Sequence, residues 1–579
     1  MALACLQPKR AWPINSQLEA QREHSPESNT FFLNKAAAVG STFWKTFQAK
    51  ILIFGGKFSV TFQTRSSVMK LDTGIEGGPE KLTAEAILLG FQHFIVMIGT
   101  TVFIPTILVP LMGGGNVEKA EVIETVLFVA GINTLLQTWF GTRLPVVMGS
   151  SYASIIPSFS IAFSNRFSIY ANPRQRFRQS MRAVQGALII AAFLQILMGF
   201  FGFVRIFTRF LSPLAAIPLV TLTGLGLFAL GFPQLARCIE VGLPALIIVV
   251  VLSQYLPHFT KSKRMVFDRF AVLLSVSIVW SYAEILTIAG AYDNRSPNTQ
   301  FSCRTDRSGL VSAAPWIRVP YPFQWGRPSF NAGDAFAMVA ASFVAFIESI
   351  GTYIAASRYA SATIPPPSVL SRGVGWQGIG TLLNGLFGTG STCSASVENA
   401  GLLGLTRVGS RRVVQISAVF MIFFSLLGKF GAVLASIPLP IMAALYCVLF
   451  AYVASAGITF LQFCNLNSFR TKFIIGFSLF MGLSVPQYFN QYLLTSGHGP
   501  VNTGLTAFNN VMQVIFSSAA TVAILIAFTL DSTHGYRDGV TRIDSGRHWW
   551  VKFRFFSSDT RSEEFYSLPY NLNRFFPSF

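Results

Sequence analysis

The sequence predicts an all-α membrane protein that crosses the bilayer many times, and three observations support this fold class. Hydrophobic residues make up 52% of the 579 residues and charged residues only 12%, whereas a soluble domain carries about 25% charged residues. Stretches of about 20 apolar residues recur along the chain, long enough to cross roughly 30 Å of hydrocarbon. Because unpaired backbone groups are costly in lipid, these stretches are expected to be helices.

Residues 1–80 precede the predicted membrane domain and differ from it in composition. Before position 70 they hold several Lys and Arg residues but few acidic ones, namely Glu19, Glu23 and Glu27. The apolar stretch at 51–62 is too short to span a bilayer, and it lacks the layout of a cleavable signal sequence. We predict a disordered cytoplasmic tail, with an organelle-targeting segment as the alternative.

The membrane domain is predicted at residues 81–531 and is followed by a cytoplasmic tail at 532–579. About fourteen spans are predicted near residues 84–110, 122–142, 146–164, 183–203, 212–231, 240–258, 269–290, 333–356, 372–390, 392–406, 412–430, 435–457, 471–489 and 510–530. A proline-rich polar loop at 291–332 divides them into two halves of seven.

The distribution of Lys and Arg predicts the orientation of the chain in the membrane. A net charge of +20 would suggest a nucleic-acid partner in a soluble protein, but here these residues act as topological signals in the loops. With the N-terminus in the cytoplasm, the inside loops are basic and the outside loop at 490–509 has no Lys or Arg. One loop on the predicted outside disagrees with this orientation, because it is basic. It holds Arg166, Arg174, Arg176, Arg178 and Arg182. The sequence favours a cytoplasmic N-terminus and no nucleic-acid partner.

Short segments recur in the same order in both halves. The tripeptide Phe-Gly-Thr at 140–142 precedes a run of mostly small residues at 149–154, and the same tripeptide at 387–389 precedes the run 390–396. An Ile-Pro pair then opens a later span in each half. Such recurrence predicts a structural repeat, in which Gly-interrupted segments at corresponding places form a binding site at the bilayer midplane.

Two carboxylates inside predicted spans, Glu348 and Glu398, are the strongest functional signal. A charge at the bilayer centre costs about 2.5 kcal/mol or more, so an acid there tends to mark function. Polar side chains recur at helical spacing beside Glu348, and Glu398 follows the run 390–396, whose free backbone groups a ligand can pair with. The structural alternative for each is an interhelical hydrogen bond. Glu284, near a span end, is expected to be exposed.

Gln92, His93 and Tyr152 are further candidates for the same site. Adjacent helical side chains point about 100° apart, so Gln92 and His93 cannot both face one ligand. One is expected to orient the site and the other to tie helices together, and a packing role for His93 is the alternative to proton coupling. Tyr152 can stack on a flat ring, with simple packing as its alternative.

A pair of buried carboxyl groups restricts the ligand. Carboxyl groups accept hydrogen bonds when ionised and donate one when protonated. A flat heterocycle with ring N–H groups and carbonyls matches this pair, whereas an anion would be repelled. Because coupled carboxyl groups can take up and release a proton, a proton is the natural coupling ion, with Na⁺ as the alternative.

Three motifs resemble the nucleobase–ascorbate transporter family (nucleobase:cation symporter-2), and its plant members most closely. The signature-like segment is Glu398-Asn399-Ala400-Gly401-Leu402-Leu403-Gly404-Leu405-Thr406-Arg407. Gln92-His93 resembles the family's first-span motif, and Phe346-Ile347-Glu348-Ser349 resembles its eighth-span acidic site. The likeness extends from about Glu85 to the C-terminus and does not cover residues 1–80.

The resemblance implies two inverted repeats of seven spans, with short extended segments in the third and tenth spans. It implies a core domain at about 84–203 and 333–430 and a gate domain at about 212–290 and 435–530. It further implies elevator-like movement of the core and a homodimer formed through the gate. We expect a secondary active transporter, not an enzyme, without a cofactor, in the plasma membrane or an organelle membrane.

The family's functional residues can be carried over position by position. Substrate contacts would fall on Glu348, Glu398, Tyr152, Val397 and Asn399. Proton coupling would involve Glu348, Glu398 and His93. The residues that would support the site without contacting the substrate are Gln92, Gly401, Thr406 and Arg407.

The first residue of the signature bears on the substrate. Glu398 resembles bacterial uracil carriers and plant members, whereas animal ascorbate carriers have Pro, so a neutral purine or uracil is favoured over anionic ascorbate. Thr352 stands where the uracil carriers have His, which puts uracil and the proton relay in question. A carrier of ascorbate or another anion is the alternative within this architecture, and a transport-dead paralogue would keep the same fold.

Other classes find little support in the sequence. It contains no HExxH, GxSxG or Walker-type GK[ST] motif, which argues against an enzyme. The cysteines are scattered and form no CxxC pair, so neither a metal site nor a disulfide framework is predicted.

Overall fold

The computed structural model describes most of the chain after the N-terminal tail. The described residues are 84–167, 169–259, 266–306, 310–534, 543–555, 559–569 and 572–573. The tail predicted at residues 1–80 lies outside them.

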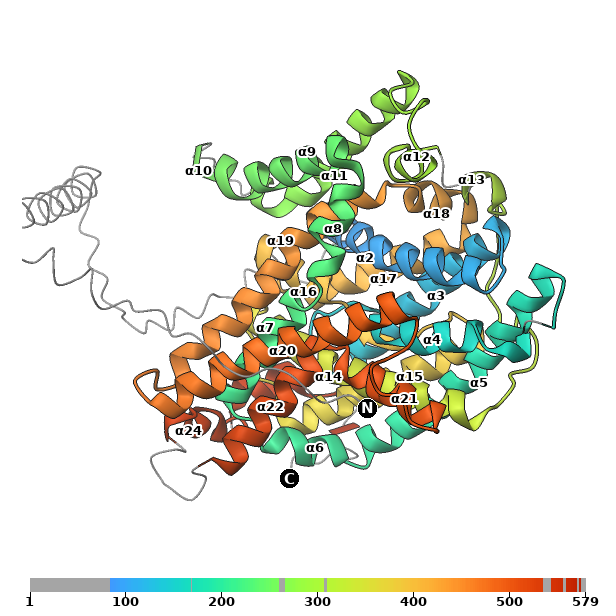
Figure 1. Cartoon of the computed structure of the whole chain (residues 1–579). Coiled ribbons are helices and arrows are strands. Elements are labelled where there is room, and N and C mark those ends of the chain that lie inside the picture. Colours follow the sequence, from blue (N-terminus) through green and yellow to red (C-terminus); the bar gives the residue numbers. More distant parts are fainter. Residues whose placement is uncertain are drawn as a thin grey trace, which may run out of the picture. The chain divides into compact units, whose positions relative to one another are not determined.

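Helices make up almost all of the described structure (Figure 1). The first half contains α2 (Ala84–Leu111), α3 (Asn116–Trp139), α4 (Ile155–Ala162), α5 (Pro173–Phe200), α6 (Phe203–Arg209), α7 (Pro213–Leu225), α8 (Phe232–Leu235), α9 (Ile239–Val250), α10 (Leu256–Phe259) and α11 (Val266–Ile288). The loop between the halves carries α12 (Pro297–Cys303) and α13 (Leu310–Ala313).

The second half also consists of helices and is followed by short C-terminal helices. It contains α14 (Ala332–Tyr359), α15 (Pro367–Phe387), α16 (Val397–Thr406), α17 (Arg411–Leu426), α18 (Gly428–Ala435), α19 (Leu439–Ile458), α20 (Phe469–Ser496), α21 (Thr506–Phe516) and α22 (Ala519–Thr533). The C-terminal segment carries α24 (Arg547–Val551) and α25 (Thr560–Tyr566).

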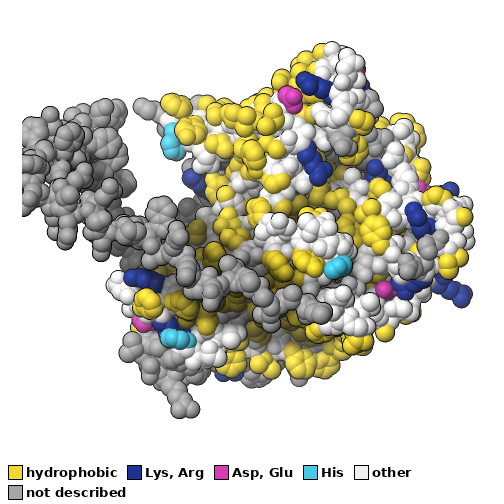
Figure 2. Space-filling view, in the orientation of Figure 1, with side chains coloured by type: hydrophobic (Ala, Val, Ile, Leu, Met, Phe, Trp, Pro, Cys, Tyr) yellow, Lys and Arg dark blue, Asp and Glu magenta, His cyan; other side chains and the backbone are white. Residues whose placement is uncertain are grey.

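The described helices confirm the predicted class of membrane protein. By length and composition, 8 helical stretches can cross a membrane, one of them the stretch Pro213–Phe259 that contains α7 to α10, or up to 10 if the bent pairs α17–α18 and α21–α22 each form one span. The exact number of fourteen spans stays a prediction. Hydrophobic side chains cover much of the face in Figure 2, and large ones such as Phe193, Ile285 and Phe480 are exposed. Extensive exposed apolar surface is typical of contact with lipid.

Two short strands confirm the extended segments that the resemblance implied. β1 (Met148–Ser150) and β2 (Cys393–Ala395) pair antiparallel, with Gly149 opposite Ser394. Each strand is followed by helical turns whose first backbone N–H groups are capped by a serine, Ser151 after β1 and Ser396 after β2. The two strands therefore form backbone hydrogen bonds with each other inside a membrane domain, where a strand with unpaired backbone groups would be costly.

The helices pack in two groups. In the first, α5 packs on α15, and α2 and α3 pack on α17, which places the blue and orange helices side by side in Figure 1. The approach of α5 to α15 is close, since a Cβ atom added at Gly199 would lie 2.3 Å from the backbone N of Gly375. In the second group, α7 packs against α19, α20 and α22, and α9 packs on α19. Helices α14 and α16 contact both groups.

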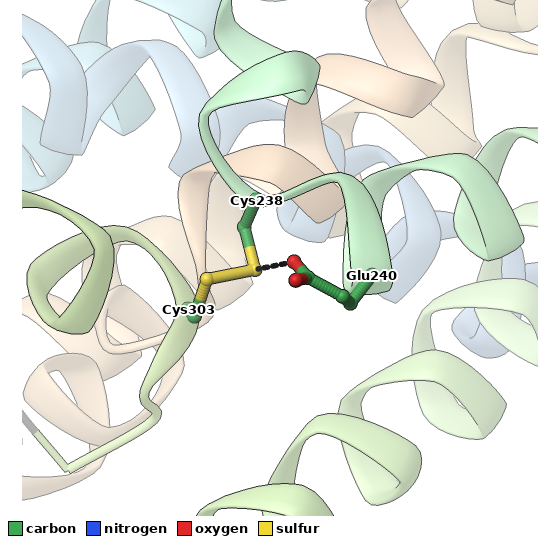
Figure 3. Close-up of side chains that lie close together, drawn as sticks. All are labelled: Cys238, Glu240 and Cys303. Atoms are coloured by element: carbon green, nitrogen blue, oxygen red, sulfur yellow. Dashed lines mark hydrogen bonds between the residues drawn. A yellow bond between two sulfur atoms is a disulfide. The ribbon is translucent and has the colours of Figure 1, made fainter. Parts of the chain in front are cut away.

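A disulfide joins Cys238, just before α9, to Cys303 at the end of α12 (Figure 3). The sequence did not predict it, because the two cysteines are 65 residues apart and follow no recognisable spacing. Disulfides persist in oxidising compartments. An exoplasmic position for these two loops is therefore expected, and the orientation of the chain in the membrane stays a prediction.

Thiol labelling is expected to detect this bond from outside intact cells. A membrane-impermeant reductant followed by an impermeant maleimide should add label to the wild-type protein but add none to the Cys238→Ser/Cys303→Ser variant. Equal labelling of the two proteins would place the cysteines on the cytoplasmic side or show that they are not bonded.

Candidate functional site

A cavity lies where β1 and β2 meet the helices. It holds about 360 Å³ of empty space, part of which is open to its surroundings. The lining residues are Thr100, Gly149, Ser150, Tyr152, Leu227, Glu348, Ser394, Ala395, Ser396, Val397 and Glu398. Both predicted carboxylates, the predicted tyrosine and Val397 therefore border one space, which we call the central cavity.

Glu348 reaches the central cavity from the middle of α14. The hydroxyl of Ser518, the residue that caps the start of α22, donates a hydrogen bond to Glu348 Oε1 at 2.7 Å. The next residue, Ser349, accepts a hydrogen bond from the backbone N–H of Ala395 at 3.0 Å. The Glu348 carboxylate is thus oriented by a helix of the second group, while its own helix is fixed to β2.

Glu398 lies in the first turn of α16, which begins after β2. The carboxylate is 2% exposed, and the hydroxyls of Thr100 and Ser396 lie beside it. A helix N-terminus carries partial positive charge and favours an acidic side chain there. This placement can compensate part of the cost of burying Glu398 at membrane depth.

Two tyrosines border the site with buried hydroxyls. Tyr152 lines the central cavity, and its ring packs edge-on against Phe103 with centroids 6.2 Å apart. Tyr446 of α19 lies close to Tyr152 and Glu398. Within the described part of the chain, neither hydroxyl has a hydrogen-bond partner. A buried unpaired hydroxyl is costly, so a ligand that pairs with one would recover that cost.

Gln92 and His93 point to different helices, as the 100° separation predicted. His93 Nδ1 lies 2.8 Å from Asn399 Oδ1, and Asn399 Nδ2 donates to Ser396 Oγ at 2.8 Å. Gln92 instead donates from Nε2 to the backbone O of Arg269 at 3.1 Å, at the start of α11. None of Gln92, His93 and Asn399 lines the central cavity. His93 and Asn399 contact it indirectly through Ser396, whereas Gln92 ties α2 to α11.

The remaining motif residues lie away from the central cavity. Gly401 permits close packing, because an added Cβ would be 2.1 Å from the backbone O of Leu449 in α19. Thr406 donates to the backbone O of Leu402 at 2.8 Å. Arg407 is exposed and ends α16 in the left-handed conformation, with φ of 58°. Glu284 is exposed, as predicted.

Replacing Ser518 with alanine is expected to raise the KM for the transported solute about tenfold. A hydrogen bond to a charged group contributes about 1.5–3 kcal/mol, and 1.4 kcal/mol corresponds to a factor of ten. Initial uptake rates at increasing solute concentration would measure the effect. Thr529→Ala, at an exposed position of the same helix, is the matched control. An unchanged KM in Ser518→Ala would show that this hydrogen bond does not orient the site.

A cavity that is bordered by two carboxylates and lies where two short strands interrupt the helices of a membrane protein is typical of a polytopic membrane carrier. Comparison with known proteins supports the assignment to membrane carriers. The model of a permease family matches residues 84–491. Nucleobase-ascorbate transporter 4 of Arabidopsis thaliana is 71% identical over 495 residues, covering 86% of this chain and 94% of that protein.

Nucleobase-ascorbate transporter 6 of Arabidopsis thaliana is 65% identical over 494 residues, covering 85% of this chain and 93% of that protein. A solved structure of SLC26A9 aligns with a TM-score of 0.42 and 12% identity, covering 69% of this chain and 62% of that one. The chain belongs to the nucleobase–ascorbate transporter family and is similar to its plant members.

Proposed function

We propose that this chain imports a neutral nucleobase, a purine or uracil, in symport with a proton. The observation that carries the proposal is that Glu348 and Glu398 border one cavity, in which no lining residue is Lys or Arg. Ring N–H groups of a base would donate to the carboxylates. The small side chains of the two strands leave backbone groups close to the ring, and Tyr152 offers an aromatic face and a hydroxyl.

Proton coupling is proposed to take place at the same two carboxyl groups. Protonation would reduce the repulsion between Glu348 and Glu398 and turn one of them into a hydrogen-bond donor. His93 would act through Asn399 and Ser396, since it does not border the central cavity. Na⁺ is the alternative coupling ion. Uptake that persists without Na⁺ and stops when the proton gradient is dissipated would support the proton.

The two helix groups suggest how the site moves. We assign the first group to a core domain, about residues 84–203 and 333–430, and the second to a gate domain, about 212–290 and 435–530. Glu398 then belongs to the core, whereas Ser518 and Leu227 reach the central cavity from the gate. Elevator-like movement of the core would break the Ser518–Glu348 hydrogen bond. A homodimer held through the gate, in the plasma membrane, fits this mechanism.

Transport of an anion such as ascorbate is the second candidate, and one observation favours it. The N-terminus of α16 faces the central cavity, and helix N-termini bind anions. The carboxylate of Glu398 already occupies this position, however, and Glu348 adds a second negative charge. We therefore favour a neutral base.

Uptake in a host that lacks its own nucleobase carriers tests both candidates. Labelled uracil, xanthine, adenine, guanine and ascorbate would be supplied with and without a protonophore. We expect accumulation of at least one base, its loss with the protonophore, and no accumulation of ascorbate. Accumulation of ascorbate alone would favour the anion carrier, and no accumulation of any solute would favour a transport-dead paralogue.

A further inference from the structure

A second, larger cavity lies beside α2, α19 and α12. It holds about 780 Å³ of empty space, part of which is open to its surroundings, and has more apolar than polar lining. Two of its lining residues, Arg237 and Arg304, directly precede and follow in sequence the disulfide cysteines Cys238 and Cys303. Figure 3 shows the disulfide itself. We call this space the outer vestibule, since a disulfide favours the exoplasmic side.

Lys119 lines the outer vestibule and has no ionic partner among the described residues. It lies in the first turn of α3 and is only 7% exposed. The neighbouring acid, Glu118, is engaged elsewhere, with Arg174 at 2.9 Å and with the backbone N–H of Gly115 at 3.0 Å. Lys119 therefore presents an ammonium group without an ionic partner to the outer vestibule, and a negatively charged ligand would pair with it.

Two arginines add positive charge at the same place. Arg304 pairs with Asp293 and Asp306, so most of its charge is compensated. Arg237 is exposed and has no ion pair within the part of the chain that the structure describes. Glu240 lies beside the disulfide, 3.7 Å from Cys238 Sγ, but is exposed and does not line the vestibule. Lys119 and Arg237 thus leave the vestibule with uncompensated positive charge.

The walls of the outer vestibule suit a ring rather than an inorganic ion. Phe103, Phe301 and Met442 are among its lining residues. Phe103 also packs edge-on against Tyr152, so this aromatic pair lies between the outer vestibule and the central cavity. An inorganic anion would leave the apolar walls without contacts, whereas a flat organic anion can use both charge and surface.

We propose that the outer vestibule binds a small organic anion with a flat ring, held by Lys119 and Arg237 and packed against Phe103 and Phe301. Charge-assisted hydrogen bonds from the two cations would orient the anionic group. This site differs in charge from the acidic central cavity. This proposal does not depend on the proposed function, because binding of the anion to the outer vestibule can be measured without transport.

Calorimetric titration of the purified full-length protein in lipid nanodiscs tests the proposal. Benzoate and benzamide share a ring and differ in charge, so we expect benzoate to bind at least tenfold more tightly. Lys119→Gln and Arg237→Gln should each weaken benzoate binding about tenfold, the usual loss for a hydrogen bond between charged groups. Arg295→Gln, an exposed cation of the same loop region, should leave it unchanged.

Further outcomes decide against the proposal. Equal affinity for benzoate and benzamide, or wild-type affinity in both Lys119→Gln and Arg237→Gln, would overturn it. Displacement of benzoate by chloride at matching concentrations would show a site for inorganic anions instead. Because Lys119 is a mostly buried residue, the thermal unfolding of the Lys119→Gln protein is measured as well. We expect an equal or higher Tm without ligand, and a large fall would mean that Lys119 has a structural partner.

Discussion

Replacing Glu398 with glutamine is expected to lower nucleobase uptake about 100-fold while leaving the amount of protein in the membrane unchanged. Glutamine keeps the size of the side chain but removes its charge and its titratable proton, and it replaces one of the two acceptor oxygens with an N–H donor. The loss of one or two hydrogen bonds to a charged group costs about 1.5–3 kcal/mol each, and 1.36 kcal/mol changes a rate tenfold. Initial uptake rates, normalised to the amount of surface-labelled protein, would measure the fall in uptake.

Glu284→Gln is the matched control for this variant. Glu284 is an exposed acid that does not line the central cavity, so the same chemical change there should leave uptake unaltered. Wild-type kinetics in Glu398→Gln would remove this residue from the site. Equal losses in both variants would indicate a general effect of charge removal on the protein.

Replacing Gly401 with alanine is expected to lower both the Tm and the uptake rate, the latter at least tenfold. The added Cβ would lie 2.1 Å from the backbone O of Leu449, so α16 and α19 would have to separate. Overpacking of this kind costs about 1–3 kcal/mol. Because α16 carries Glu398, separation of the two helices would also displace the carboxylate. Thermal unfolding of the purified protein and uptake in cells give the two readouts.

Gly476→Ala provides the control for that substitution. Gly476 also lies in a helix, α20, but an added Cβ would meet nothing within 4 Å. Alanine is the better helix former by about 1 kcal/mol, so an equal or slightly higher Tm is expected there. A Gly401→Ala protein as stable and active as Gly476→Ala would show that the close contact between α16 and α19 is not maintained.

Part of this site could be predicted from sequence because its signals are unusual in a membrane. Glu348 and Glu398 are visible since acids inside apolar spans are rare. The two runs of small residues are visible because they interrupt helices at corresponding places in both halves. Tyr152 follows from its position in the first run and Val397 from the resemblance to the family, and all four residues border the central cavity.

Other parts of the site had no such signal. Ser518 is an ordinary serine 170 residues from Glu348, and Tyr446 is a tyrosine in an apolar helix. Both reach the site only through the packing of α22 and α19, which no local pattern encodes. The disulfide between Cys238 and Cys303 likewise depends on tertiary contact across 65 residues.

The signature motif shows how helix geometry separates neighbouring residues. Asn399 follows Glu398 directly, so its side chain points about 100° away and meets His93 instead of the central cavity. Arg407 lies nine positions after Glu398, which is about 14 Å along the helix axis at 1.5 Å per residue. One motif therefore contains a cavity residue, a residue that positions it and an exposed helix end.

An experimental structure with a transported base bound would test most directly whether Glu348 and Glu398 form one binding site. We predict that the base lies in the central cavity, with ring N–H groups toward both carboxylates and its face against Tyr152. Density for the base at another place, with Glu348 and Glu398 in contact only with protein, would contradict the account.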